Sequence, residues 1–286
     1  MPDPFQIDTL LMIALIGLLA GTLGGLLGVG GSVITIPGMA ILFGTGENQH
    51  LYQAAAMTAN LAVAIPAARR HMQAGALRPA VLKWMLPVTV VFIVVGVLAS
   101  NLPVFNVKNG GEGGLWLGRV LAVFLIYVIA VNIRKLFRSA EKKAADWARE
   151  PKTTPARCSA VGVIMGFAAG LMGIGGGALA VPLQQTLVKL PFRNAIANSS
   201  FVMVFSAGIG AVLKLTTLGQ HYPATGGGWP AWQLALLLAG ILAPTAIIGA
   251  TIGAKLTHTL RPRYVRIAFI LLMIVAAFKM AELPLG

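Results

Sequence analysis

The sequence predicts an all-α polytopic membrane protein built from two inverted-topology repeats, and three observations lead to this fold class. First, 57% of the 286 residues are apolar and only 10% are charged, whereas about a quarter of a soluble domain is charged. Second, several apolar stretches reach the roughly 18 residues that can cross a bilayer. Third, a glycine-rich sequence in the first half of the chain returns in the second half.

The repeated sequence is a glycine-rich break inside an apolar segment. Residues Gly21–Pro37 read GTLGGLLGVGGSVITIP, and residues Gly166–Pro182 read GFAAGLMGIGGGALAVP. Such breaks in both halves of an apolar chain are typical of transporters whose substrate site lies at the breaks. We therefore expect a first transmembrane repeat (1–133), a cytoplasmic linker (134–157) and a second transmembrane repeat (158–286).

Each half contains five apolar segments in the same order. They cover 7–28, 31–43, 53–68, 80–101 and 115–133 in the first half, and 158–174, 177–190, 195–213, 229–254 and 264–281 in the second. The first two segments of each half flank the break, and the second is short, since about 13 residues form only about 20 Å of helix. Each half is predicted to hold a glycine-broken, re-entrant helix pair and three spanning helices. Two full crossings per pair are the open alternative.

The basic residues predict the orientation of the loops. Most of the 22 Lys and Arg residues lie in four stretches, at 69–83, 134–157, 189–193 and 255–266. Because basic residues accumulate in cytoplasmic loops, these stretches are predicted to face the cytoplasm. The second half is then inverted relative to the first, and both termini lie outside the cytoplasm. The cytoplasmic loops of a protein embedded in the lipid bilayer therefore account for the net charge of +14, and nucleic acid is not an expected partner.

The glycine breaks predict a binding site for an anion. Glycine permits positive φ and close approach of other groups, and the helix after each break begins with N–H groups that have no intrahelical partner. Those N–H groups and the helix dipole attract anions. The candidate substrate-binding residues at the breaks are Gly28, Gly30, Gly31, Ser32, Gly173, Gly175, Gly176 and Gly177.

Polar residues in the third segment of each half extend the candidate site. These residues are Thr58, Asn60, Asn198, Ser199 and Ser200. Polar groups in hydrocarbon surroundings face a ligand, a cavity or another helix, so interhelical hydrogen bonding is the open alternative. Regularly spaced glycines, as in Gly21-x3-Gly25, Gly166-x3-Gly170 and Gly249-x3-Gly253, are instead typical of closely packed membrane helices.

The titratable residues argue against an enzyme. The eight acidic residues and four histidines fall near segment ends or in loops, so neither a convergent catalytic set nor a carboxylate proton relay is expected within the membrane. Cys158 is the only cysteine. We expect no metal site and no cofactor.

With these motifs the chain resembles the sulfite exporter TauE/SafE family, also called the 4-toluene sulfonate uptake permease family. The resemblance rests on the two glycine clusters, each followed by a proline at Pro37 or Pro182, and covers nearly the whole chain. It implies transport of sulfite or organosulfonates across the bacterial inner membrane. Two positions depart from the family pattern. Ser32 replaces a glycine, and Ala59-Asn60 replaces the usual Thr-Ser pair.

The residues and the resemblance together predict a membrane transporter of small sulfur-containing anions. We expect an exporter that works by alternating access, with its site between the two glycine breaks. A membrane potential of 100 mV supplies about 2.3 kcal/mol per charge, which favours export of an anion without a coupling carboxylate. An ion-coupled sulfonate uptake permease and an anion channel are the alternatives. The particular anion, the coupling ion and the oligomeric state stay open, with a homodimer among the alternatives.

Overall fold

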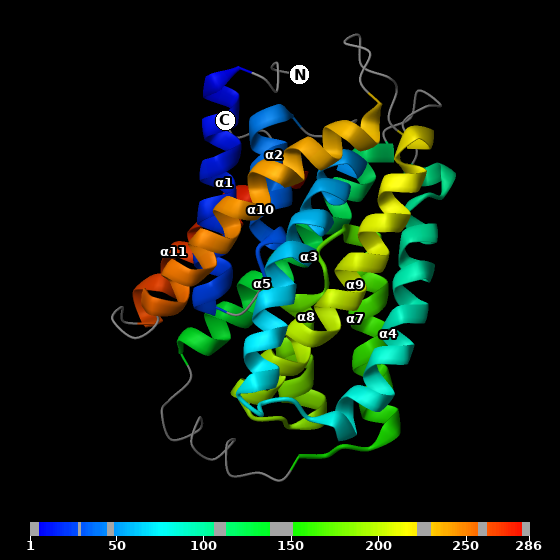
Figure 1. The fold of residues 1–286 in the computed structure, drawn as a ribbon, viewed down its shortest axis with the longest axis vertical. Helices are drawn as coiled ribbons and strands as arrows, with labels where there is room; N and C mark the ends of the chain where they lie inside the picture. Colours follow the sequence, from blue (N-terminus) through cyan, green and yellow to red (C-terminus); the bar gives the residue numbers. More distant parts are fainter. Residues whose placement is uncertain are drawn as a thin grey trace.

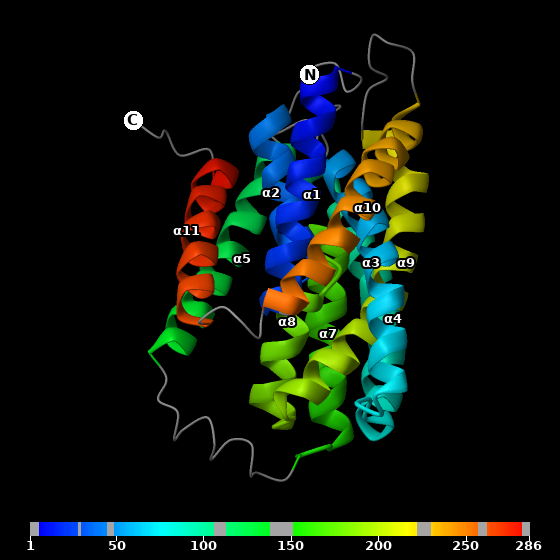
Figure 2. The ribbon, with the colours of Figure 1, turned by 60° about the vertical axis from the view of Figure 1, so that its left-hand side comes forward.

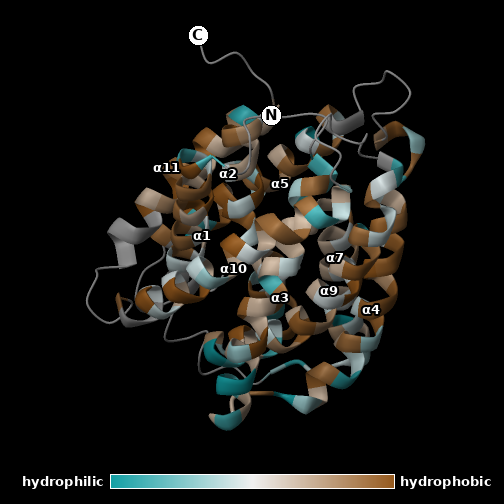
Figure 3. Ribbon diagram, turned by 45° about the horizontal axis from the view of Figure 1, so that its top comes forward, coloured by the Kyte–Doolittle hydropathy of each residue, from teal (hydrophilic) through white to brown (hydrophobic). Residues whose placement is uncertain are grey.

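The computed structural model describes residues 6–27, 30–44, 49–105, 113–137, 151–221, 230–256 and 262–281. The regular elements in these ranges are all helical, and seven helices are long and apolar enough to cross a membrane. The helices form one elongated bundle (Figure 1). Its walls are mainly hydrophobic, with hydrophilic residues mostly at the helix ends (Figure 3). The expected all-α, multi-pass membrane fold is confirmed.

The same order of helices occurs in both halves. The first half contains α1 (Ile7–Leu27), α2 (Ser32–Phe43), α3 (Gln49–Gln73), α4 (Pro79–Ser100), the 3₁₀ turn η1 (Pro103–Phe105) and α5 (Gly113–Leu136). The second half contains α7 (Pro155–Met172), α8 (Gly177–Leu183), the π-helical turn η2 (Gln184–Val188), α9 (Phe192–His221), α10 (Ala231–Leu256) and α11 (Pro262–Ala281). Most of the linker expected at 134–157 lies outside the described residues.

The second break is made of residues in the left-handed backbone conformation. Gly173 ends α7 with φ +72°, and its N–H donates to the carbonyl oxygen of Ala169 over 2.9 Å. Gly175 and Gly176 follow with φ +64° and +81°. Side chains make this conformation costly, which explains the glycine cluster. In the first break, Gly30 has φ +86°, and α2 begins two residues later.

The two halves pack through helix pairs that each join one half to the other. α1 packs along α10, α4 along α7, α3 against α9, and α5 against α11. Figures 1 and 2 show that α2 lies beside α1 toward the end of the bundle marked N, whereas α8 lies toward the opposite end beside α7. The helix pair around the first break and the helix pair around the second break therefore approach the centre of the bundle from opposite ends.

Glycines allow these paired helices to approach backbone to backbone. A methyl carbon on Gly21 of α1 would collide with the carbonyl oxygen of Ala246 in α10, and one on Gly249 of α10 would collide with that of Leu18. At the equivalent interface, Gly170 of α7 lies directly against the backbone of α4. The packing role expected for the spaced glycines is confirmed at these positions.

Gly249→Ala is expected to destabilise the protein, because overpacking a tight interface costs about 1–3 kcal/mol. The matched control is Gly240→Ala on the same helix, where an added methyl carbon meets nothing within 4 Å and alanine improves helix propensity. Melting temperature in detergent measures both. Equal effects of the two substitutions would contradict the close packing of α1 on α10.

Candidate functional site

A direct hydrogen bond joins the two glycine breaks. The Ser32 hydroxyl, at the first residue of α2, donates to the carbonyl oxygen of Ile174 in the second break over 2.6 Å. The amide Nδ2 of Asn60 in α3 donates in turn to the Ser32 hydroxyl oxygen over 2.7 Å. Ser32 and Asn60 are both buried, at 1% and 3% exposure. Ser32 and Asn60, which form this network, are both positions at which the sequence departs from the family pattern.

The second break is also held from α9 and α3. The Ser206 hydroxyl of α9 donates to the carbonyl oxygen of Gly175 over 2.9 Å. The Cα of Gly175 lies against the side chain of Asn60, where a methyl carbon would come within 2.7 Å of Nδ2. Gly173 lies equally close to the side chain of Gln53. Glycine is thus required here both by φ and by contact with α3.

The helix after each break presents N–H groups without a partner in the described structure. In α2, the N–H groups of Ile34 and Thr35 both donate to the carbonyl oxygen of Gly31. This leaves the N–H groups of Ser32 and Val33 unpaired among the described residues. Unpaired N–H groups at the start of a helix carry partial positive charge. α2 has 12 residues, and the seven residues of α8 continue directly into the five residues of η2.

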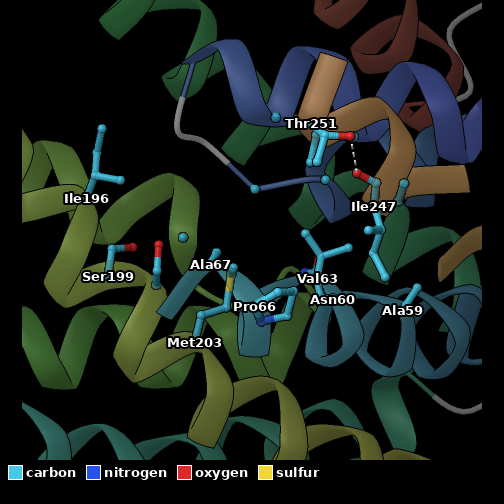
Figure 4. A pocket seen from close by; sticks show the side chains of 18 of the residues that line it. Ala59, Asn60, Val63, Pro66, Ala67, Ile196, Ser199, Met203, Ile247 and Thr251 are labelled. Carbon is cyan, nitrogen blue, oxygen red and sulfur yellow. Dashed lines mark hydrogen bonds between the residues drawn. The ribbon is translucent and has the colours of Figure 1, made fainter. Parts of the chain in front are cut away.

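A cavity of about 300 Å³ lies against both breaks. Gly30, Gly31 and Gly177 contribute backbone to it, and α3, α9 and α10 form its walls. Figure 4 shows the side chains of Asn60 from α3, Met203 from α9 and others from α10 around this space. Most of the lining is apolar. A largely apolar cavity with a few placed polar groups is typical of small-molecule sites.

The hydroxyl groups in the cavity differ in whether they already make hydrogen bonds within the protein. Ser199 and Ser200 of α9 line the cavity, and neither hydroxyl makes a hydrogen bond with any described residue. The hydroxyl of Thr251 in α10 donates to the Ile247 and Ile248 carbonyl oxygens of its own helix. Ser199 and Ser200 are thus the side chains in this wall that are free to bind a ligand.

Two basic side chains lie where the cavity reaches the end of α3. Arg70 and His71 line this part of the cavity, and Arg70 is exposed. We name this part the cavity mouth. A guanidinium group at the mouth raises the positive potential along the entrance, which attracts anions.

Comparison with models of known protein families identifies the family of the chain. The family model described as "Sulfite exporter TauE/SafE" matches residues 13–280. The chain belongs to the TauE/SafE family. Both glycine breaks and the cavity they adjoin fall within the matched region, and no solved structure matches the chain.

Similar members of the TauE/SafE family are named as membrane transporters. The chain is 27% identical to "Probable membrane transporter protein MamO" of Magnetospirillum gryphiswaldense, over 96% of this chain but 45% of that protein. It is 25% identical to "Probable membrane transporter protein YunE" of Bacillus subtilis, over 88% of this chain and 90% of that protein. The chain therefore spans less than half the length of MamO and most of the length of YunE.

The predicted site residues separate into two groups. Those that line the cavity are Gly30, Gly31, Asn60, Gly177, Ser199 and Ser200. Those that lie elsewhere are Ser32, Thr58, Gly173, Gly175, Gly176 and Asn198. The Asn198 side chain accepts the backbone N–H of Arg78 at the start of α4 over 2.9 Å, and Thr58 donates to the Ala54 carbonyl oxygen in its own helix. Gly28 lies outside the described residues.

Several cavity residues were not among the predicted site residues. Arg70 was assigned to a cytoplasmic loop, and Met203 and Thr251 carry no pattern in a single sequence that separates them from other residues of an apolar helix. The sequence does place Met203 four residues after Ser199, a predicted site residue, and residues four apart share a helix face.

Ser32→Ala is expected to lower the melting temperature, because it leaves the amide of Asn60 and the carbonyl of Ile174 without their partner. A buried polar group that loses its partner costs about 1–3 kcal/mol. Thr58→Val is the control, since it removes a hydroxyl that bonds only within α3. A wild-type melting temperature for Ser32→Ala would show that the bond between the breaks contributes little stability.

Proposed function

We propose that this TauE/SafE protein transports small sulfur-containing anions across the bacterial inner membrane, with the cavity at the glycine breaks as the substrate site. One observation carries the proposal. The cavity combines backbone from both breaks with two hydroxyls, those of Ser199 and Ser200, that have no described protein partner. Hydroxyl and N–H donors bind the oxygens of a sulfite or sulfonate group through charge-assisted hydrogen bonds.

The composition of the cavity supports an anion with room for an organic group. The donors lie near the breaks, while apolar side chains such as Val63, Met203 and Ile247 form much of the walls. A volume of about 300 Å³ is at the lower end of the range for small-molecule sites. A sulfonate with a short carbon chain satisfies both the polar and the apolar parts of this lining.

The position of the cavity mouth and the sign of the membrane potential support export. The cavity mouth contains Arg70 and His71 at the end of α3, within one of the basic stretches that the charge pattern assigns to the cytoplasm. An anion entering there is driven outward by the membrane potential, at about 2.3 kcal/mol per charge and 100 mV. With two inverted-topology repeats, the opposite state arises when the repeats exchange conformations around the same site.

Two alternatives share this site and differ in kinetics. An uptake permease would accumulate the anion only with a coupling ion, and a channel would pass ions without saturation. Initial rates from proteoliposomes, measured against anion concentration and against an imposed potential, separate the three mechanisms. Saturable efflux that accelerates with an inside-negative potential supports the exporter.

The first test is binding of sulfite to the detergent-solubilised protein by calorimetry, with sulfoacetate, taurine and sulfate as competitors. Saturable binding with a preference among these anions supports the proposal. If no sulfur anion binds the wild-type protein and none crosses proteoliposomes containing it, the proposed function is wrong.

The double substitution Ser199→Ala/Ser200→Ala is expected to weaken anion binding by at least tenfold, because each hydrogen bond to a charged ligand contributes about 1.5–3 kcal/mol. Thr216→Ala on the same helix is the control, since this exposed hydroxyl bonds only to carbonyl oxygens of α9. Calorimetry with the preferred anion measures both. Unchanged affinity in the double variant would place the substrate elsewhere.

Arg70→Gln is expected to weaken anion binding severalfold and to reduce its dependence on ionic strength, because the charge at the cavity mouth is screened by salt. Arg69→Gln is the matched control, since Arg69 is also exposed but does not line the cavity. Titrations at low and high salt measure the difference. Identical salt dependence in the two variants would contradict a role for the mouth.

A further inference from the structure

Lys214 of α9 is a fully buried lysine inside the bundle. Its side chain is 1% exposed. Its ammonium group donates to Gln53 Oε1 of α3 over 2.5 Å and to the Ser100 hydroxyl oxygen at the end of α4 over 2.6 Å. Both partners are neutral, and a lysine ammonium has three donors. One donor therefore has no partner among the described residues.

The charge of Lys214 has no acidic counterpart in the described part of the chain. Asp8 is the one carboxylate side chain in that part, and it is exposed at the start of α1. A buried charge without an opposite charge is costly, and ionisable residues within membrane helices mark functional positions by default. The structure thus keeps an ionisable amine where packing alone would favour an apolar residue.

A second buried polar group lies one turn away without a partner. Both amide atoms of Gln49, which is fully buried, make no hydrogen bond in the structure. Gln49 precedes Gln53 by four residues, so both lie on the same face of α3. Lys214 and Gln49 each keep a donor without a partner among the described residues. We name Lys214, its partners Gln53 and Ser100, and Gln49 the lysine cluster.

The lysine cluster and the cavity lie along the same helices at different levels. Gln53 and Asn60 are seven residues apart on α3, and Lys214 and Met203 are eleven apart on α9. Both spacings return to nearly the same helix face, at about 10 Å and about 16 Å along the axis. Since the cavity mouth is at the end of α3, the cluster lies on the other side of the cavity from the mouth.

An apolar plug separates the two levels. Met57, between Gln53 and Asn60 on α3, is fully buried and packs with Ile93 and Ala211. Gly210 of α9 makes room for it, because a methyl carbon there would collide with the Met57 side chain. Buried apolar side chains thus fill the space between the cavity and the lysine cluster in this conformation.

Gln53 couples the lysine cluster to the second break. Its Nε2 donates to the carbonyl oxygen of Leu171 near the end of α7 over 3.4 Å, and its side chain lies against Gly173. Gln53 therefore contacts both the second break and the Lys214 side chain.

From this geometry we propose that the lysine cluster is a second anion-binding site on the transport path, which receives the sulfur oxyanion after the Met57 plug opens. The proposal rests on the proposed function. The ammonium of Lys214 and the amide of Gln49 supply donors for the oxyanion, and Gln53 and Ser100 hold the ammonium in place until it arrives.

The test compares wild-type protein with Lys214→Gln and Lys214→Met, using calorimetry with sulfite and sulfoacetate and efflux of the same anions from proteoliposomes. Glutamine keeps donors for Gln53 and Ser100 but removes the charge. We expect Lys214→Gln to retain its melting temperature and to bind anions within twofold of wild type, because the cavity is unchanged. Its maximal transport rate is expected to fall at least tenfold.

The outcomes separate this proposal from the function on which it rests. Wild-type transport rates in Lys214→Gln would overturn it, since hydrogen bonding alone would then explain the lysine. A parallel loss of melting temperature and rate would also overturn it, because the lysine would then be a structural member of the α3–α9 interface. Lys214→Met shows the effect of losing the hydrogen bonds as well. If the wild-type protein itself binds and transports no sulfur anion, the proposed function fails first.

Discussion

The arrangement of the site depends on the hydrogen bond from the Ser32 hydroxyl to the carbonyl oxygen of Ile174. It connects the start of α2 in one half to the break after α7 in the other, so the two interruptions form one unit at the centre of the bundle. Asn60 completes the unit by donating to Ser32. Irregular backbone at membrane depth is tolerated only where protein or a water-filled cavity satisfies its polar groups, and here a side chain at the first break satisfies a carbonyl oxygen of the second.

The sequence predicted the elements well, because glycine breaks and apolar segments are local signals. The short α2 and α8, the long helices between them and the close glycine packing all follow from spacing along the chain. Partnership between distant residues could not be predicted in the same way. Asn198 looked like Asn60, yet its side chain binds the backbone of Arg78, because only the tertiary contact of α9 with the loop before α4 decides its partner.

The burial of Lys214 is the feature of the structure that differs most from what the sequence indicates. Lys214 is one basic residue near the end of an apolar segment, and such a lysine is ordinarily expected to reach the membrane surface with its long side chain. The structure instead directs it inward to Gln53 and Ser100. Gln53, Met57 and Asn60 then divide a single face of α3 into polar, apolar and polar levels. That order is visible in the sequence only once the inward face of the helix is known.

The pairing of helices between halves determines the order in which the molecule can be assembled. α1 is synthesised about 200 residues before α10, which is its extensive partner in the bundle. Until then the glycine-lined surface around Gly21 faces lipid rather than the α10 backbone. The nascent chain must therefore hold α1 in the bilayer without its final partner until α10 follows. The interface between α1 and α10 forms only after α10 has been synthesised, so a chain that ends before α10 lacks the surface that covers the glycines of α1.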